Sequence, residues 1–307
     1  MSIVIVLYDS AEVIGECIAA LPAGVELIVV DNASSDGGAA LVSNLRPDAT
    51  LLRSAVNLGL GAAFNLGVEA SSGSQLLFLN PDARIAAESV DRMAQTLAAA
   101  THAIVGPALV DGLGLRIPLQ RSPSPWRYAL QILPGAASWL PRSLRIELSD
   151  DHPVYQAGGR VPCVLGCCFM IARGDLDAIG GFDSDLFLYD EEESLSARIE
   201  RIGGSAVYEP RAQSVHLKSS SIAQVGQLAT FHMYRSHALI ARKRHGELVG
   251  RAWLSPLLLA LAMALPQAAL NSVLRRASPY DLEWWCAATR GLFAGNAAVM
   301  RSGVSYR

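Results

Sequence analysis

The chain has 307 residues, of which 51% are hydrophobic and 17% are charged. This composition excludes an intrinsically disordered chain and allows one large domain with an appendage, or two small domains. The net charge of -3 is uneven, because residues 235–307 carry ten Lys/Arg against three Asp/Glu, about +7, which leaves about -10 for the first 234 residues. A basic C-terminal part predicts contact with an anionic partner such as a membrane surface. Nucleic acid fits less well, because the basic residues are not interleaved with a repeating aromatic pattern.

The five cysteines are an odd number in a chain that is not small, which favours a reducing cytosol over a disulfide scaffold. Cys163, Cys167 and Cys168 lack the spacing of a paired zinc site, so we expect buried strand cysteines. A strand-like run begins at Ser2, so we expect no secretory signal peptide.

The first hundred residues alternate between strand and helix patterns. Apolar runs predict strands at 3–7, 26–30, 50–53 and 75–79, with helices including 12–21 and 61–70 between them. This alternation predicts a parallel sheet covered by helices on both faces. Such sheets bind ligands at the carboxyl ends of their strands, so the residues after each strand are the first candidates for a site.

The second half of the chain is less regular. Five prolines between 112 and 152 indicate an irregular insert that could line an acceptor site. Strand patterns return at 160–171, 206–208 and 213–216, with a helix at 191–202. The remainder is predicted to be helical, at 224–245, 253–274 and 279–300.

Two acidic residues follow predicted strands. Asp31 ends the run Val-Val-Asp-Asn, where its carboxylate could accept a hydrogen bond from a base or sugar hydroxyl; Asp36 suits a helix cap better. Asp82 ends Asn80-Pro81-Asp82, where one carboxylate could anchor the Mg²⁺ or Mn²⁺ that accompanies a diphosphate. An Asn-Pro-Asp turn without a ligand is the alternative interpretation of the second motif.

A run of acidic residues, 190–193, opens the predicted helix 191–202. Acidic residues in a first turn are ordinary partners of the helix dipole. Glu191 and Glu192 lie on the two flanks of the apolar stripe formed by Leu195, Ile199 and Ile202, whereas Glu193 points nearly opposite. A flanking carboxylate that faces a cleft could serve as a general base.

Two further features are weak on their own. The glycine-containing stretch 57–61 before a helix could present backbone N–H groups to phosphate. His216 follows a short strand, and a histidine in that position is more often packed than a ligand.

Taken in order, these motifs resemble the family 2 glycosyltransferases, particularly their bacterial rhamnosyltransferase-like branch. The matching pieces are VVDNASSDG at 29–37, NLGLGAAFNLG at 57–67, LFLNPD at 77–82, GGFD at 180–183, FLYDEE at 187–192 and VHLKSSS at 215–221. The resemblance covers roughly residues 2–246. It implies an α/β GT-A (Rossmann-like) catalytic domain at 1–223, with a donor half at about 1–110 and an acceptor half at about 111–223. A helical C-terminal extension at 224–307 would follow.

The resemblance also implies roles for individual residues. Glu192 would be the catalytic base, and Asp82 with His216 would hold Mg²⁺ or Mn²⁺. Glu191 and Lys218 are secondary candidates. Separately from the resemblance, residues 218–222 form a Ser-rich segment with few residues that could pack it, so we expect this segment to move when substrate binds. The donor-binding residues would be Tyr8, Asp31, Asn57, Gly59, Asn65, Asn80 and Asp82.

Four departures from the family pattern affect these roles. Glu192 stands where the family usually has Asp, and a base misplaced by ~1 Å can cost on the order of 10²-fold in rate. A later acidic position of the same helix is Ser194. Phe64 replaces an Asn, and Leu217 replaces a second His.

The implied activity is an inverting, metal-dependent transfer of a sugar from a nucleotide diphosphate donor. By resemblance the donor is dTDP-rhamnose and the acceptor is a cell-envelope glycan or a polyprenyl-linked lipid. The protein would act in the cytoplasm at the inner face of the membrane, with a homo-oligomer as an open alternative. Residues 252–274 carry no charge and are long enough for a span, but two prolines favour a helix lying on the membrane or on the catalytic domain. A helix packed as core is the third interpretation.

Two other functions stay open. A nucleotidyltransferase would also use an acidic metal site on an α/β sheet, but residues 8–10 lack a basic, glycine-rich nucleotide signature. An inactive family member could act as a scaffold in glycan assembly, which the Glu192 departure would explain.

Overall fold

The computed structural model describes residues 1–121, 124–133, 136–217, 221–274 and 281–294. The chain divides into two compact units. The first unit comprises Met1–Arg121, Leu148–Ser184 and Glu191–Gln224, and the second comprises Ser122–Glu147, Asp185–Asp190 and Val225–Arg307. The second unit therefore contains two segments that precede the predicted domain boundary at residue 223.

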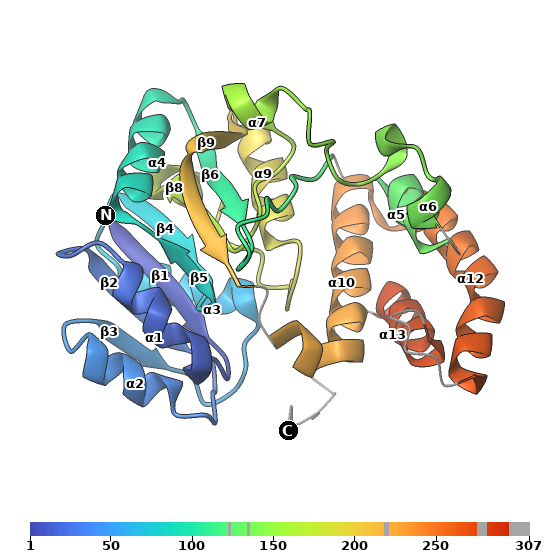
Figure 1. Ribbon diagram of the computed structural model, residues 1–307, viewed down its shortest axis with the longest axis horizontal. Helices are drawn as coiled ribbons and strands as arrows, with labels where there is room; N and C mark the ends of the chain where they lie inside the picture. The colour runs from blue at the N-terminus through green and yellow to red at the C-terminus, as the bar shows by residue number, and fades with distance from the viewer. Residues whose placement is uncertain (122–123, 134–135, 218–220, 275–280, 295–307) are drawn as a thin grey trace. The chain divides into compact units, whose positions relative to one another are not determined.

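A nine-stranded sheet forms the centre of the first unit (Figure 1). The strands are β1 (Ser2–Leu7), β2 (Glu26–Asp31), β3 (Thr50–Arg53), β4 (Gln75–Leu79), β5 (Ala83–Ile85), β6 (Ala103–Val110), β7 (Gly159–Val161), β8 (Cys168–Ala172) and β9 (Ser205–His216). Their order is β3-β2-β1-β4-β8-β6-β9-β5, and β7 pairs with β9.

The predicted parallel arrangement holds for β1 to β4 and again for the pair β6–β9, but it is interrupted by β8 and does not extend to β5 and β7. The pairs β1–β2, β1–β4 and β2–β3 are parallel, whereas β8 runs antiparallel to both β4 and β6. The prediction rested on the alternation of strand and helix patterns, which ends at β4. The segment that leads into β8 is irregular and has no helical crossover that would require β8 to run parallel to its neighbours. The sheet is therefore mixed, as is common for large sheets.

Helices cover both faces of the sheet, because the strand residues alternate between two buried cores. Ile3, Ile5 and Leu7 face one core, and Val4 and Val6 face the other. The first core is covered by α1 (Ala11–Ala20), α2 (Gly38–Leu45) and α4 (Ala87–Ala99). The second is covered by α3 (Leu60–Ala70), α8 (Arg173–Ala178) and α9 (Glu191–Arg201), and a short helix α7 (Val154–Ala157) also contributes to it.

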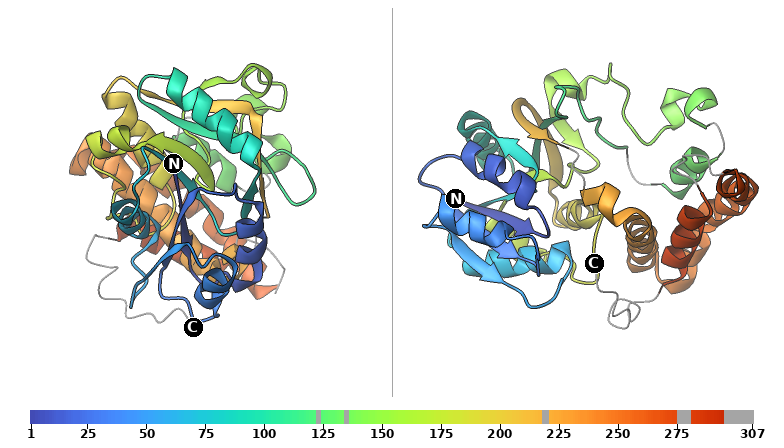
Figure 2. Two further views of the ribbon diagram at one scale, coloured as in Figure 1. Left: turned by 90° about the vertical axis from the view of Figure 1, so that its left-hand side faces the viewer. Right: turned by 60° about the horizontal axis from the view of Figure 1, so that its bottom comes forward.

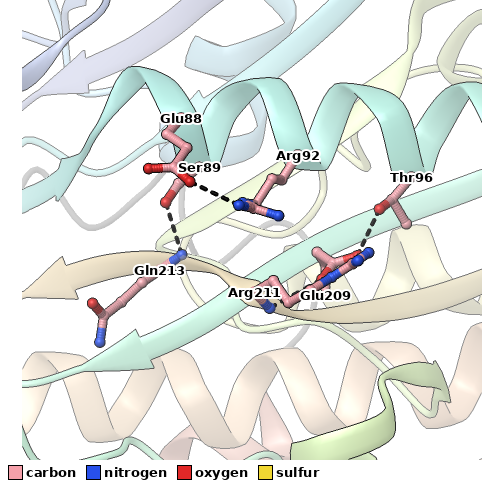
Figure 3. Close-up of polar contacts among 7 residues, drawn as sticks. All are labelled: Glu88, Ser89, Arg92, Thr96, Glu209, Arg211 and Gln213. Atoms are coloured by element: carbon pink, nitrogen blue, oxygen red, sulfur yellow. Dashed lines mark hydrogen bonds and ion pairs between the residues drawn. The ribbon is translucent and has the colours of Figure 1, made fainter.

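Strand β9 carries a bulge at the point where two separate strands were predicted. Pro107 of β6 pairs with Glu209, but the next residue, Ala108, pairs with Gln213. Helix α4 forms hydrogen bonds with β9 on both sides of this bulge. Thr96 Oγ1 donates to Glu209 at 2.8 Å, and the backbone N–H of Gln213 donates to Ser89 Oγ at 2.9 Å (Figure 3). The bulge therefore bends β9 without ending it.

Glu209 is the main polar anchor of this region. Its side chain accepts hydrogen bonds from Arg211 Nε at 2.9 Å and from the Arg211 backbone N–H at 3.0 Å (Figure 3). These bonds, with that from Thr96, lower the pKa of Glu209 to about 2 although its burial acts in the opposite direction.

The second unit is helical (Figure 2). Its helices are α5 (Pro125–Ile132), α6 (Ala136–Trp139), the 3₁₀ helix η1 (Arg142–Leu144), α10 (Ser221–His245), α11 (Glu247–Trp253), α12 (Ser255–Val273) and α13 (Leu282–Phe293). The first four residues of α10 are assigned to the first unit. An apolar core joins α10, α12 and α13, with α5 packed against it. The three predicted C-terminal helices are confirmed where the structure describes them, and the expected irregular insert contains short helices.

Helix α12 is long and apolar enough to cross a membrane by length and composition, and 39% of its apolar window is buried in the structure. A core helix of a soluble protein passes the same test.

Candidate active site

The carboxyl ends of β1, β2 and β4 lie at one edge of the sheet, because these strands are parallel and in register. Leu7 of β1 pairs with Asp31, the last residue of β2. Tyr8 directly follows β1, and Asn80 directly follows β4. The structure therefore brings to one edge the residues that were selected for following predicted strands.

Asp31 is held in a defined orientation at this edge. Its Oδ1 accepts the backbone N–H of Ser34 at 2.9 Å, and the residue is only 8% exposed. Ala33 between them has a positive φ of 69°, which turns the chain sharply after the strand. Asp36 accepts backbone N–H groups from Ala11 at 2.6 Å and Gly38 at 3.0 Å, so it binds the first N–H of both α1 and α2 without being the N-cap residue of either helix.

A side-chain amide network links β2 to the loop before α3. Asn32 Nδ2 donates to Asn57 Oδ1 at 2.9 Å, and Asn32 Oδ1 accepts the backbone N–H of Leu58 at 2.9 Å. Asn57 Oδ1 also accepts the N–H of Gly59 at 2.9 Å. Asn32 is 2% exposed, and sequence reasoning gave it no role, although its place beside Asp31 was the available signal.

Tyr8 is connected to the same network through a side-chain hydrogen bond with Asn57. Burial, together with the charge of Asp9, raises the pKa of Tyr8 above its usual value despite that bond. The phenol therefore keeps its proton and can act as a donor.

Gly59 forms the entry to α3 with φ of 84° and ψ of 167°, a conformation that favours glycine. The backbone after Gly59 turns directly into the 11-residue helix α3. The predicted glycine-containing loop before a helix is thus present, held in place by Asn32 and Asn57.

Asn65 is placed differently from the other predicted donor residues. Its Oδ1 accepts the backbone N–H of Phe182 at 2.8 Å, and its Nδ2 donates to the Phe182 carbonyl at 3.0 Å. Both ends of the amide therefore hold the GGFD segment, and a donor contact of Asn65 stays a prediction.

Asp82 and His216 meet across two antiparallel strands. Ala83 of β5 pairs with His216 of β9, and His216 Nε2 lies 3.3 Å from Asp82 Oδ1. The Leu217 N–H donates to the Asp82 carbonyl at 3.1 Å, which fixes the pair from the backbone side. The side chains are 11% and 17% exposed.

This pair passes a simple chemical test for a divalent cation. One carboxylate and one imidazole offer an oxygen and a nitrogen to Mg²⁺ or Mn²⁺, which take their remaining ligands from phosphate and water in phosphate-bearing sites. Among the residues that the structure describes, no group of three or more His, Cys, Asp or Glu could hold a metal ion. A cation here would therefore depend on the bound substrate for its other ligands.

Glu192 reaches the same region from α9. A Cβ at Gly166 would lie 2.9 Å from Glu192 Oε2, so the carboxylate rests directly against this glycine. The charges of both Asp82 and Glu192 act on the neighbouring thiol of Cys167, and with burial as the largest cause they raise its pKa. The Cys167 carbonyl in turn accepts the Asn80 N–H at 2.8 Å. Residues 166–167 therefore connect the candidate base to the candidate metal residue.

The prediction that Glu193 points away from the buried side of its helix is wrong. Glu193 is 7% exposed and Glu191 is 4% exposed, whereas Glu192 is only partly buried. A helical-wheel argument assumes one buried face, but the first turn of α9 is enclosed on more than one side. A Cβ at Gly61 of α3 would lie 3.6 Å from Glu191 Cγ, so Glu191 faces the start of that helix.

Two further expectations concern residues near the site. Lys218 lies outside the described residues, as do Ser219 and Ser220. The expectation of buried cysteines is confirmed for Cys163, Cys167 and Cys168, although only Cys168 lies in a strand; Cys17 is buried as well, and all four are free thiols.

Comparisons with known proteins identify the family of the chain. The sequence model of the family described as "Glycosyl transferase family 2" matches residues 2–180. A curated protein of Mycobacterium tuberculosis (strain CDC 1551 / Oshkosh), "N-acetylglucosaminyl-diphospho-decaprenol L-rhamnosyltransferase", is 27% identical over 236 residues, which cover 72% of this chain and 76% of that protein.

Solved structures resemble the chain in fold. The mannosyltransferase PcManGT from Pyrobaculum calidifontis, in complex with GDP-Man and Mn²⁺, matches with a TM-score of 0.55 and 20% identity, over 97% of this chain and 85% of that one. GalNAc-T7 with UDP, GalNAc and Mn²⁺ matches with a TM-score of 0.55 and 15% identity, over 80% of this chain. The match spans 50% of the length of GalNAc-T7.

Proposed function

Because the chain belongs to glycosyltransferase family 2, we propose that it transfers a sugar from a nucleoside diphosphate donor to an acceptor hydroxyl with inversion of configuration. The predicted GT-A fold is confirmed by the solved structures that the chain resembles. The observation that carries the proposal is the connection of Glu192 to the Asp82–His216 pair through residues 166–167. A base and a diphosphate-binding pair at one site are what a single displacement requires.

Each residue of the sheet edge has a task in this proposal. Asp31 binds the nucleobase, and Tyr8 donates a hydrogen bond to the donor. Asn57 and Gly59 hold the entry of α3, whose N-terminus favours negative charge. Asp82 and His216 hold Mg²⁺ or Mn²⁺, which when bound neutralises charge on the diphosphate.

Glu192 acts on the acceptor in this reaction. It removes the proton of the acceptor hydroxyl while the oxygen attacks the anomeric carbon from the face opposite the diphosphate. The bond between the anomeric carbon and the diphosphate oxygen breaks, and the nucleoside diphosphate leaves. One displacement inverts the configuration, so the second carboxylate of a double-displacement enzyme is not needed.

L-Rhamnose from dTDP-rhamnose is the donor sugar that we propose, onto a lipid-linked or other cell-envelope glycan. The mycobacterial relative is named as a rhamnosyltransferase acting on a decaprenol-linked sugar, and this name supports both choices. The identity of 27% leaves other hexoses as outcomes of the donor assay described below.

We further propose that the second unit docks on an anionic membrane through the exposed face of α12. Leu257, Leu261 and Ala268 face the core of that unit. The opposite side of the helix is also apolar, and it is exposed at Leu259 (61%), Met263 (58%), Leu270 (46%) and Val273 (79%). A surface helix normally carries charged residues on its solvent face, and α12 carries none.

Charge and aromatic residues favour a lipid surface as the occupant of this face. The C-terminal part of the chain carries about +7, and Arg251, just before α12, has a side chain that is 68% exposed. Trp126 and Trp139 in α5 and α6 are 63% and 52% exposed, and exposed indoles are typical of membrane interfaces. A protein in this position would meet a polyprenyl-linked acceptor where that acceptor resides.

Vesicle sedimentation tests the docking surface. Met263→Glu with Val273→Glu should abolish binding to vesicles that contain phosphatidylglycerol, whereas Leu113→Glu, which replaces an 85% exposed leucine of the first unit, should not. Unchanged binding of the double variant would reject the surface. A dimer that the double variant disrupts would instead assign this face to a second copy of the chain.

The catalytic proposal is tested by nucleoside diphosphate release from a panel of donors with Mg²⁺, Mn²⁺ or EDTA, with membranes supplied as acceptor. Glu192→Gln should lose transfer, and Glu200→Gln, the same change at an exposed position of α9, should keep it. Equal activity of wild type and Glu192→Gln would reject Glu192 as the base. Silence of the wild type with every donor, together with no nucleotide binding, would favour the inactive scaffold.

A further inference from the structure

Helix α10 forms hydrogen bonds, an ion pair and apolar contacts with the segment Asp185–Asp190. This segment leads directly into the helix that carries Glu192. Both the segment and residues 225–245 of α10 belong to the second unit. The contacts between them are polar at both ends of the segment and apolar in its centre. This arrangement is unusual for a loop, which normally lies on the surface with few fixed contacts.

The amino end of the segment is held through Asp185. Arg235 Nη1 donates to the Asp185 carbonyl at 2.9 Å, and Lys243 Nζ forms an ion pair with the Asp185 carboxylate at 2.8 Å. Arg235 is 2% exposed, so its guanidinium group is buried beside the backbone of the loop. Such a buried cation is retained only where it is well bonded.

The centre of the segment is packed against the same helix. Leu186 forms an apolar cluster with Leu239 and Ile240. The ring of Phe187 stacks on His232, with 4.5 Å between the ring centroids and 23° between the planes. Burial, followed by the charge of Arg235, lowers the pKa of His232 to about 4, so this stack involves a neutral imidazole.

The carboxyl end carries the contacts closest to Glu192. Ser236 Oγ donates to the Leu188 carbonyl at 2.9 Å, and His237 Nδ1 lies 2.6 Å from Asp190 Oδ2. A carboxylate oxygen accepts, so Nδ1 of His237 carries the proton of this hydrogen bond. The His237 ring also packs on Tyr128 of α5, with 4.2 Å between centroids.

The backbone of this end is strained. Tyr189 and Asp190 have consecutive positive φ values of 71° and 67°, a region that non-glycine residues rarely occupy. Strained residues persist only where surrounding contacts determine their conformation. Ser236 bonds the carbonyl just before the strained pair and His237 bonds the second residue of the pair, so both contacts restrain its conformation.

We infer that Ser236 and His237 are positioning residues for Glu192. They hold the strained dipeptide 189–190 in the one conformation from which α9 starts with Glu192 correctly placed. Asp190 directly precedes Glu191 and lies two residues before the base, so its φ sets the direction in which the chain enters α9. This inference rests on the proposed role of Glu192, and it adds a requirement that the residues leading into α9 be held in one conformation.

The test distinguishes an effect on the orientation of Glu192, which changes kcat, from an effect on donor binding, which changes KM and Kd. His237→Ala should lower kcat on the order of 10²-fold, as expected for a base misplaced by about 1 Å, while the KM for the donor and the Kd of the nucleoside diphosphate change less than about twofold. His237→Asn should recover most of the rate, because an Asn amide N–H can occupy the place of Nδ1–H. The double variant Asp190→Ala/His237→Ala should be no slower than either single variant.

Lys243→Ala is the matched control, because it removes a partly exposed contact at the far end of the same segment. It should leave kcat within about twofold. If His237→Ala fails to fold, Asp190→Asn and Ser236→Ala give the same comparison with smaller changes. The inference is overturned if His237→Ala keeps its kcat, if its loss appears in donor KM, or if His237→Asn is as slow as His237→Ala. Loss of activity in Glu192→Gln with full activity in His237→Ala would overturn the aiming role while leaving the proposed function intact.

Discussion

Asp82 Oδ1 lies 3.3 Å from His216 Nε2, although the two residues are far apart in the sequence. The first precedes β5 and the second ends β9, and the antiparallel pairing of these two strands brings them together. We predict that Asp82→Asn, which keeps the size but removes the charge, lowers kcat on the order of 10²–10³-fold. His216→Ala should weaken metal affinity by about 10–100-fold with a smaller loss of rate at saturating metal.

A Mn²⁺ titration of sugar transfer measures both effects. Asp175→Asn is a suitable control, because Asp175 forms another His–Asp pair in the first unit, with His102 at 2.7 Å. If Asp82→Asn required no more Mn²⁺ than the wild type and kept its rate, Asp82 would not hold the metal.

Gly166 leaves the space that the Glu192 carboxylate occupies. In Gly166→Ala the new Cβ would lie 2.9 Å from Oε2 and 3.0 Å from Cδ of Glu192, so the carboxylate must move by some tenths of an ångström. We expect kcat to fall by about 10- to 100-fold, with little change in unfolding free energy, because a flexible side chain can give way. Gly174→Ala should behave as the wild type, since nothing lies within 4 Å of its Cβ position. Steady-state kinetics and urea unfolding would decide between this outcome and a harmless substitution.

Glu209 should make the stability of the protein depend on acid pH. Its folded pKa of about 2 lies below the usual value of 4.5, so its ionised form stabilises the fold above about pH 4.5. That contribution is lost as the pH falls from about 4.5 to about 2. Glu209→Gln should cost about 1 kcal/mol at pH 7, a small value because Arg211 is exposed to solvent, and a smaller amount at pH 3, where part of the contribution is already lost.

Urea unfolding of wild type and Glu209→Gln at both pH values is the measurement. Glu88→Gln breaks a solvent-exposed i,i+4 pair with Arg92 in the same region and should change stability by less than about 0.5 kcal/mol at either pH (Figure 3). A Glu209→Gln effect of equal size at pH 7 and pH 3 would contradict the assignment.

The cysteines should differ sharply in reactivity. Burial raises the pKa of Cys168 to about 12, and burial together with the charge of Asp82 raises the pKa of Cys17 and Cys167. Only the thiolate reacts readily, so iodoacetamide at pH 8 should modify the exposed Cys286 first. Mass spectrometry should find one modified thiol in the native protein and five in denaturant. Early modification of Cys167 would mean that the core behind Asp82 opens readily.

Much of the donor edge could be predicted from the sequence, because it depends on local signals. A buried strand followed by a polar residue identifies Asp31 and Asn80 without knowledge of their neighbours. The loop 57–61 is likewise marked by glycines and a following helix. The individual roles of these residues stay predictions, whereas the family and the fold are confirmed.

The rest of the site depends on contacts that no local pattern encodes. The antiparallel insertion of β8 between β4 and β6 depends on which strands pair with one another, and the strand propensity of residues 168–172 does not determine that pairing. The burial of Glu193 was predicted wrongly, because helical periodicity describes one helix and contains no information about the elements packed around it. The contacts of α10 with the segment before Glu192 join residues about 50 positions apart in the sequence. The hydrogen bond between Ser236 and Leu188, which are 48 positions apart, is an example.

The position of β8 has a consequence for how the protein is made. During synthesis β4, with the apolar sequence Gln75–Leu79, leaves the ribosome well before its neighbour Cys168–Ala172 exists. An open, apolar strand edge pairs readily with other chains, and slowly completed sheets prolong that exposure. Nascent chains of this protein should therefore depend on chaperones until β8 emerges, and translation stalled between these two strands should yield aggregates instead of a folded N-terminal half.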